Sequence, residues 1–336
     1  MSDPGQGIAV LVNANAKRGG RRVAAEISRT LKGANVRLTR SLEEIEQWLR
    51  ILPEPRCILS AGGDGTAMAL LTALRRVRKP GSPFPTVGLL KLGTGNGWAR
   101  ATGALKLGET LRLLAQSSGP FPTRDFGIID VEGQLCPFAG SGWDGMILND
   151  YKDQLRESKG ATFLTKSISG YLLAIVTRTV PKALAQGRPH MVVENLGDDA
   201  YTIDRAGNLV LLPDVRKGTV LYDGTFGVTG FATTADYGGG FRAFPFAERL
   251  PGYGNFRVYD GHPLRALSMI RELWFGRHPM PGMSDWFTTG IRMTFERNVP
   301  LQVGGDAVGE RRVVEYRLAD EKVPLLDWRR LRDGQS

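Results

Sequence analysis

The sequence is organised around the stretch Cys57-Ile-Leu-Ser-Ala-Gly-Gly-Asp-Gly-Thr66. An apolar run ends in a glycine-rich turn, and residues 67–74, rich in Ala and Leu, follow it. This order is typical of a buried strand, a tight loop and the start of a helix. Glycines let a loop approach a ligand closely, and the N–H groups at a helix start favour an anion. The stretch therefore predicts a phosphate-binding loop.

Asp64 lies in the middle of this loop. A carboxylate beside a phosphate is repulsive, so its use there would be to hold Mg²⁺ or to accept a proton. A tight strand–helix turn that binds no ligand is the alternative interpretation of the same residues.

Neighbouring strands end in residues of the same kind. Residues 8–12 lead into Asn13, residues 36–39 end at Thr39, and residues 86–90 precede a second glycine-rich segment. Strands that alternate with amphipathic helices indicate an α/β domain, in which helices cover both faces of a parallel sheet. Ligands bind such sheets at the carboxyl ends of the strands. The residues expected there are Asn13, Thr39, Gly62, Gly63, Gly65, Thr66, Gly93, Thr94, Gly95 and Asn96.

The pattern changes at residues 118–122, which have the composition of a connection. Short alternating strands separated by turns follow, which favours a second, mainly antiparallel β domain. We expect an α/β nucleotide-binding domain over residues 1–120 and a second, β-rich domain over residues 121–318. Residues 319–336 are expected to pack back on the first domain.

The composition narrows the function classes. The net charge is +10, but the basic residues are spread out and no nucleic-acid-binding motif accompanies them. A membrane surface or a nucleotide is therefore a better partner than nucleic acid. Two cysteines, no signal-peptide pattern and no apolar run long enough to cross a membrane favour the reducing cytosol.

These motifs carry a resemblance. Together, the motifs resemble the catalytic domain of the diacylglycerol kinase family, which includes bacterial soluble lipid kinases and sphingosine and ceramide kinases. GGDGT alone is shared with NAD kinases and 6-phosphofructokinases. The matching segments are Leu11-Val-Asn13, GGDGT at 62–66, LGTGN at 92–96, Arg124-Asp-Phe-Gly127, Gly142-Trp-Asp144, Tyr237-Gly-Gly-Gly-Phe241 and Gly309-Glu310.

The resemblance implies ATP- and Mg²⁺-dependent phosphorylation of a lipid hydroxyl in a cleft between the two domains. Asn13, Thr39, residues 63–66 and Thr94 would contact ATP, and Asp64 would lie beside the transferred phosphate. Asp64 is the first candidate for general base, with contact to Mg²⁺ as the competing role. Glu310, the nearest match to the glutamate of the family's late Asp-Gly-Glu motif, is the second, and a solvated glutamate in a hairpin turn is its alternative.

Three departures from the family pattern are visible. Gly97 stands where the family usually has an acid after Gly-Thr-Gly-Asn. The Asp-Gly-Glu motif appears split between Asp306 and Glu310. Residues 246–255 lack the paired aspartates that hold a structural Mg²⁺ in bacterial members, so we expect no such site here.

The sequence indicates less clearly which residues would contact the lipid. Asp125 and Asp144 are candidate substrate residues, with ordinary turn or strand-end aspartates as the alternative. Leu264, Leu267, Ile270 and Leu273 or Trp274 recur at helical spacing, with Arg265, Arg271 and Arg277 between them. Such a helix can lie on an anionic membrane or pack on the sheet with its arginines in water, and we favour the second.

The sequence as a whole predicts a cytoplasmic lipid kinase that is peripheral to an anionic membrane and acts on a diacylglycerol-like or sphingoid lipid. An NAD kinase-like enzyme and a catalytically inactive nucleotide- or lipid-binding regulator are the alternatives. The sequence leaves the oligomeric state open, a homodimer included.

Overall fold

The computed structural model describes residues 5–14, 20–93, 96–117, 119–157, 170 and 173–334. It divides into two compact units, Met1–Ile128 with Ala319–Ser336, and Ile129–Leu318. The boundary follows Ile128 rather than residue 120, because β5 (Thr123–Phe126) pairs with the C-terminal strand β18 (Val323–Leu326) in the first unit. Residues 123–131 form two strands, β5 in the first unit and β6 (Ile129–Val131) in the second.

The first unit contains a six-stranded sheet in the order β2-β1-β3-β4-β18-β5 within the described residues. Strands β1 to β4 and β18 are parallel, and β5 is antiparallel at the edge. Its other elements are β1 (Ile8–Asn13), α1 (Gly20–Thr30), β2 (Asn35–Thr39), α2 (Leu42–Ile51), β3 (Cys57–Gly62), α3 (Asp64–Val77), β4 (Val87–Lys91), α4 (Gly97–Ala101), α5 (Leu107–Gln116) and α11 (Trp328–Asp333).

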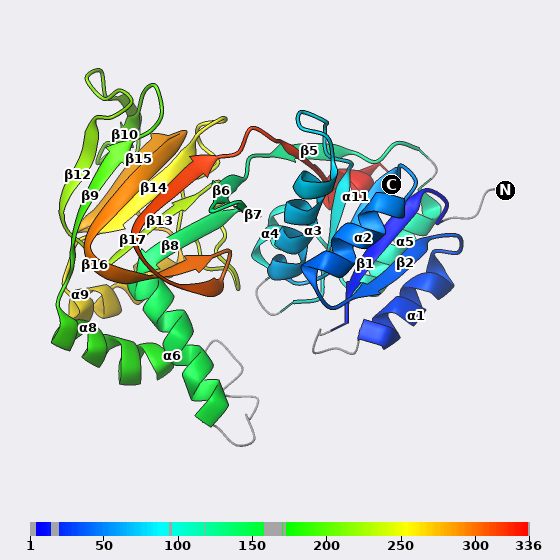
Figure 1. Ribbon diagram of the computed structural model, residues 1–336, viewed down its shortest axis with the longest axis horizontal. Helices are drawn as coiled ribbons and strands as arrows, with labels where there is room; N and C mark the ends of the chain where they lie inside the picture. Colours follow the sequence, from blue (N-terminus) through cyan, green and yellow to red (C-terminus); the bar gives the residue numbers. More distant parts are fainter. Residues whose placement is uncertain are drawn as a thin grey trace. The chain divides into compact units, whose positions relative to one another are not determined.

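The strands of this sheet differ in how far their side chains are buried. Every residue of β3 is buried, as expected for a near-continuous apolar strand with helices on both faces. Strand β2 lies at the sheet edge, and its first four residues alternate between exposed and half-buried. Helix α2 packs against α3 and α1 against α5, which gives the sheet its two helical layers (Figure 1). The predicted α/β architecture is confirmed.

The second unit is built on a large antiparallel sheet, twelve strands within the described residues. Ten of them follow the order β11-β10-β15-β14-β13-β8-β16-β17-β6-β7, while β9 pairs with β12 and β16 (Figure 1). The strands are β6 (Ile129–Val131), β7 (Gln134–Cys136), β8 (Phe138–Gly142), β9 (His190–Asn195), β10 (Tyr201–Ile203), β11 (Leu209–Leu211), β12 (Val220–Thr225), β13 (Val228–Ala232), β14 (Gly254–Tyr259), β15 (Met283–Thr288), β16 (Gly290–Val303) and β17 (Asp306–Leu318).

Within the described residues, the helices assigned in this unit are short, apart from one. They are α6 (Trp143–Glu157), the π-helical turn η1 (Ile175–Thr179), α8 (Val180–Gln186), α9 (Pro263–Ser268) and α10 (Ile270–Trp274). The single helix expected over residues 264–274 is wrong, because Met269 leaves helical geometry (φ −100°, ψ 14°) and separates α9 from α10. In the part of the chain that the structure describes, no helix has the length and apolarity to cross a bilayer.

Candidate functional site

The carboxyl ends of four neighbouring strands meet in the first unit. Asn13 at the end of β1 is in register with Thr39 at the end of β2, and Gly62 of β3 with Lys91 of β4. Strand β1 lies between β2 and β3, so the connection from β1 leads to β2 on one side and the chain then crosses back to β3 on the other side. The strand order therefore reverses at β1. Ligands of open α/β sheets bind at such a switch point.

The side chain of Asn13 bridges this switch point. Its Nδ2 donates a hydrogen bond to Oγ1 of Thr66 at 3.1 Å, which joins the end of β1 to the first turn of α3. Thr66 and Thr39 are both buried. The Asn13–Thr66 hydrogen bond thus holds the end of β1 against the start of α3.

Two glycine-rich segments lie in direct contact at the same edge. A Cβ built on Gly93 would lie 2.5 Å from Cα of Gly63, and one built on Gly62 would lie 2.2 Å from Oγ1 of Thr66. Only glycine allows this approach, because a backbone atom cannot move aside as a side chain can. Asn96 closes the second segment in left-handed geometry (φ 50°), and its Oδ1 accepts a hydrogen bond from the N–H of Gly93 at 2.7 Å.

Asp64 has a structural role that the sequence did not indicate. Its carboxylate accepts hydrogen bonds from the backbone N–H groups of Gly97 (3.0 Å) and Trp98 (3.2 Å) in the first turn of α4. A carboxylate at a helix N-terminus satisfies donors that lack a partner within the helix. Asp64 therefore ties the second glycine-rich segment to the start of α3. Gly65 is exposed in the first turn of α3, and the predicted contacts Thr94 and Gly95 lie outside the described residues.

The first unit therefore fits a phosphate chemically. Helix α3 has fourteen residues, and no side chain caps its N-terminus. Its first-turn N–H groups and the positive end of its dipole lie at the strand ends, beside glycines that let the two segments approach closely. Asp64 adds one carboxylate at this position, which suits Mg²⁺ that is bound mainly by substrate phosphates. No cluster of three or more potential metal-ligating side chains occurs among the described residues.

The second unit contains a large apolar cavity. It encloses about 1190 Å³ of empty space, open solvent included, and is lined by α6, η1, α8, β13, β14, the segment 237–244, α9 and α10. Of the described residues that line it, only Asp144 and Arg257 carry charge. Arg257 is neutralised by Asp285, whose carboxylate accepts two hydrogen bonds from the guanidinium, at 2.8 and 2.9 Å. Asp144 is thus the charged group that the cavity offers to a ligand.

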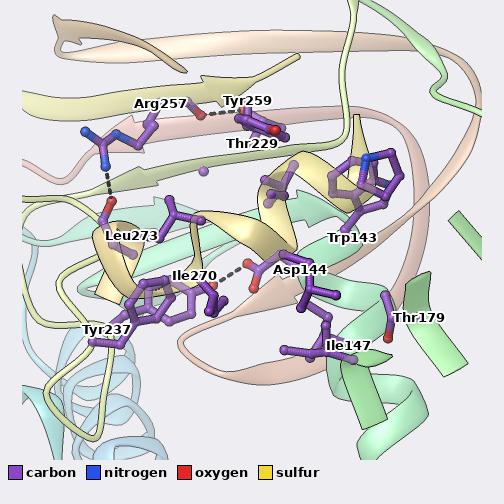
Figure 2. A pocket seen from close by; sticks show the side chains of 18 of the residues that line it. Trp143, Asp144, Ile147, Thr179, Thr229, Tyr237, Arg257, Tyr259, Ile270 and Leu273 are labelled. Atoms are coloured by element: carbon purple, nitrogen blue, oxygen red, sulfur yellow. Dashed lines mark hydrogen bonds between the residues drawn. The ribbon is translucent and has the colours of Figure 1, made fainter. Parts of the chain in front are cut away.

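Asp144 belongs to a hydrogen-bonded chain at the cavity wall. Its Oδ2 accepts a hydrogen bond from the hydroxyl of Tyr237 (Figure 2). The Tyr237 hydroxyl in turn accepts a hydrogen bond from Nε2 of Gln302. Oε1 of Gln302 accepts the N–H of Gly305 at 2.7 Å. Burial raises the pKa of Asp144 to about 6, against the opposing effect of the hydrogen bonds from Tyr237 and Gln302. Gly140 is required beside it, since a Cβ there would lie 2.1 Å from Oδ2 of Asp144.

The three glycines after Tyr237 place its ring. Gly238, Gly239 and Gly240 all have positive φ (126°, 64° and 89°), which an L side chain rarely adopts. The turn closes with a hydrogen bond from the N–H of Tyr237 to the carbonyl of Phe241 (2.8 Å) and one from the N–H of Phe241 to the carbonyl of Gly238 (3.0 Å). Both side chains line the cavity. The sequence singled out this segment as a motif, but neither the role of the Tyr237 hydroxyl nor that of Gln302 was predicted.

The other predicted acids lie elsewhere. Asp125 is exposed on β5 in the first unit. Glu310 lies within β17, opposite Pro300 of β16, and is exposed. It is absent from the cavity lining. The β16–β17 turn is made by Gly304 and Gly305, so Asp306, the first residue of β17, adjoins the Gln302 end of the hydrogen-bonded chain.

Comparison with known proteins agrees with this arrangement. Residues 7–118 match the family model described as diacylglycerol kinase catalytic domain. A stretch of 46 residues is 50% identical to the eye-specific diacylglycerol kinase of Drosophila melanogaster, which covers 14% of this chain but only 3% of that much longer relative.

Two solved structures share the fold. A diacylglycerol kinase from Bacillus anthracis str. Sterne has a TM-score of 0.60 at 13% identity, over 95% of this chain and 96% of its own. An NAD kinase from Archaeoglobus fulgidus, solved in complex with ATP, has a TM-score of 0.50 at 12% identity, over 97% and 96%. At these identities the likeness concerns the fold alone. Residues 7–118, with their glycine-rich segments at the strand ends, are thus the part of the chain that matches the diacylglycerol kinase catalytic-domain model.

Proposed function

We propose that the chain is an ATP- and Mg²⁺-dependent lipid kinase that phosphorylates the hydroxyl of a diacylglycerol-like or sphingoid lipid. The observation that carries this proposal is the cavity in the second unit, which is apolar except for Asp144 and the neutralised Arg257. Acyl chains need such a lining, and a lipid alcohol needs one polar contact to orient it. The catalytic-domain family of residues 7–118 supplies the phosphate chemistry.

ATP is proposed to bind at the strand ends of the first unit. The N–H groups of the first turn of α3 and the glycines at 62, 63 and 93 would hold its phosphates, with Asn13, Thr39 and Thr66 around them. Thr94 and Gly95, between Gly93 and Asn96, complete the proposed contacts. The ATP complex of the NAD kinase with the same fold supports this assignment.

Magnesium is proposed to enter with the nucleotide. Mg²⁺ keeps several waters and is commonly bound by one or two carboxylates plus substrate phosphates. The two oxygens of Asp64 accept the backbone N–H groups of Gly97 and Trp98, and Asp64 itself is the first residue of α3. This carboxylate is therefore proposed to contact the phosphate-bound metal while it holds α4. Bound Mg²⁺ would neutralise charge on the phosphate oxygens.

Asp144 is proposed to orient the acceptor hydroxyl and take its proton. An alcohol attacks phosphorus effectively only if its proton is accepted as the new O–P bond forms. In the balanced step this bond forms, the bond from phosphorus to the ADP oxygen breaks, and the hydroxyl proton moves to Asp144. A carboxylate whose pKa is raised to about 6 is both largely ionised and a competent base near neutral pH.

The decisive experiment is an acceptor panel with labelled ATP and Mg²⁺. Diacylglycerol, sphingosine, ceramide and NAD are compared, with wild-type protein, Asp144→Asn and the matched surface control Asp125→Asn. We expect transfer to a lipid, on the order of 100-fold slower for Asp144→Asn and unchanged within about twofold for Asp125→Asn. Transfer to NAD alone would show the NAD kinase-like alternative to be right. ATP binding without turnover on any acceptor would show a regulator without catalysis.

A further inference from the structure

Helices α9 and α10 have two distinct faces. Their inward side chains form one wall of the apolar cavity, and Figure 2 shows Ile270 and Leu273 of α10 directed toward it. Yet α10 has no buried residue, and Pro263 is the only buried residue of α9. These helices therefore cover the cavity without being embedded in a core. The residues on the inward face are Pro263, Ala266, Leu267, Ile270, Leu273 and Trp274.

The outward face combines exposed apolar and cationic side chains. Leu264 is 53% exposed and Phe275 is 59% exposed. Arg265, Arg271 and Arg277 are exposed, and none of them forms an ion pair with another described residue. We call these five residues the α9–α10 surface. Exposed Leu and Phe side chains together with arginines on short helices are the pattern of segments that lie in a membrane interface.

The neighbouring elements extend this surface. Helix α8 packs beside α9, and η1 and α8 also line the cavity. Val176 of η1 is 49% exposed, and Leu184 of α8 is 46% exposed. The cations on this side are already paired, Arg178 with Glu157 and Lys182 with Asp150. The net attraction for an anionic partner therefore comes from the three arginines, against one partly buried acid, Glu272.

We infer that the α9–α10 surface, with the adjoining exposed side chains of η1 and α8, docks on an anionic lipid bilayer. Apolar side chains enter the boundary between headgroups and acyl chains, and each arginine near an anionic leaflet contributes about 1 kcal/mol. The same helices then present the cavity wall to the membrane from which the substrate comes. This inference rests on the proposed function in one respect, namely that the cavity is the binding site of the lipid substrate.

Vesicle binding tests the inference without using catalysis. The full chain is sedimented with phosphatidylcholine vesicles that contain or lack phosphatidylglycerol, without ATP or any acceptor lipid. Arg265→Gln/Arg271→Gln/Arg277→Gln is compared with Arg205→Gln/Arg216→Gln/Lys217→Gln, which removes the same charge from exposed loops of the same unit. We expect the first set to weaken binding to anionic vesicles on the order of 100-fold and the second to leave it nearly unchanged. Equal losses for both sets, or no binding by wild type, would overturn the inference.

A fluorescent label tests the position of the surface. Native Cys57 and Cys136 are buried, so Phe275→Cys and the control Leu211→Cys, on the exposed edge strand β11, can be labelled selectively. A polarity-sensitive dye at position 275 is expected to shift to the blue on anionic vesicles, while the dye at 211 is not. A shift at 275 that follows protein concentration without vesicles would assign the surface to a second copy instead. Turnover of a water-soluble short-chain acceptor separates the two proposals: its absence counts against the kinase, not against docking.

Discussion

The two candidate sites differ in how the chain builds them. In the first unit, Gly62 to Thr66 and Gly93 to Asn96 are short contiguous segments at adjacent strand ends. In the second unit, Asp144, Tyr237 and Gln302 come from three distant parts of the chain and meet only in the folded sheet. The proposed phosphate site of the first unit uses backbone N–H groups and the close approach that glycines allow. The second depends on side chains and on their burial.

This difference implies different responses to mutation. A backbone site tolerates little change in shape, because a new Cβ meets another backbone. A side-chain site can lose one function while it keeps its shape, since an isosteric amide can replace a carboxylate. The predictions below use this contrast.

Substitution of Asp64 should give the largest loss of phosphate transfer, because this side chain both holds α4 in place and supplies a negative charge. Asp64→Asn retains one acceptor for the N–H groups of Gly97 and Trp98, whereas Asp64→Ala retains none. We expect both variants to lose phosphate transfer on the order of 1,000-fold. Only Asp64→Ala should also lose stability, by about 1–3 kcal/mol in urea unfolding. Near-normal transfer by Asp64→Asn would limit Asp64 to a structural role.

Gly93 tests the contact between the two glycine-rich segments. In Gly93→Ala the new Cβ would lie 2.5 Å from Cα of Gly63, so the segments must separate. We expect kcat/KM for ATP to fall on the order of 100-fold, with lipid binding by the second unit retained. The control is Gly108→Ala in α5, where a Cβ meets no atom within 4 Å and activity should change by less than about twofold. Unchanged ATP kinetics in Gly93→Ala would contradict the proposed phosphate site.

The sequence predicted the fold of the first unit well, because its signals are local. Apolar runs that end in Asn13, Thr39 and Gly62 correspond to β1, β2 and β3. Their lateral order, with β1 between β2 and β3, follows from no single segment and had to be observed. The boundary near residue 120 was wrong for a similar reason, because the partner of β5 is the distant strand β18.

The sequence predicted less of the second site. Asp144 was a candidate because it lies beside glycine, but its raised pKa depends on burial by segments far along the chain. Helical periodicity over residues 264–274 identified the apolar face of α9 and α10, yet not the break at Met269. The role of Asp64 as a carboxylate that caps helix α4 was not predicted either. Gly97 was one indication of this role, because a glycine leaves its N–H group accessible to a nearby acceptor.

Asp144 should also make the stability of the protein depend on pH. Its pKa is raised from 3.8 to about 6, so the folded protein binds more protons than the unfolded chain between these values. The free energy of unfolding contributed by this group therefore falls as pH rises from about 4 to 6 and is constant above. Asp144→Asn should remove this fall, a gain of up to about 3 kcal/mol at pH 8 relative to pH 3.5, in urea titrations at both pH values. A constant difference between the two proteins across this range would contradict the burial of the carboxyl group.

Substitution of Glu310 should change the activity least. It distinguishes between two candidates for the general base, Asp144 from the structure and Glu310 from the family motif. The side chain is exposed on β17 and lies outside the cavity lining. We expect Glu310→Gln to change kcat by less than about twofold, as for other surface substitutions. Asp306→Asn is the matched comparison, because Asp306 adjoins the turn that hydrogen-bonds Gln302. A 100-fold loss in Glu310→Gln alone, with normal lipid binding, would identify Glu310 as the base and leave Asp144 to orient the hydroxyl. Similar activity in both variants would instead leave Asp144 as the carboxylate nearest the acceptor, and the chemistry of the second site would then depend on a single buried acid.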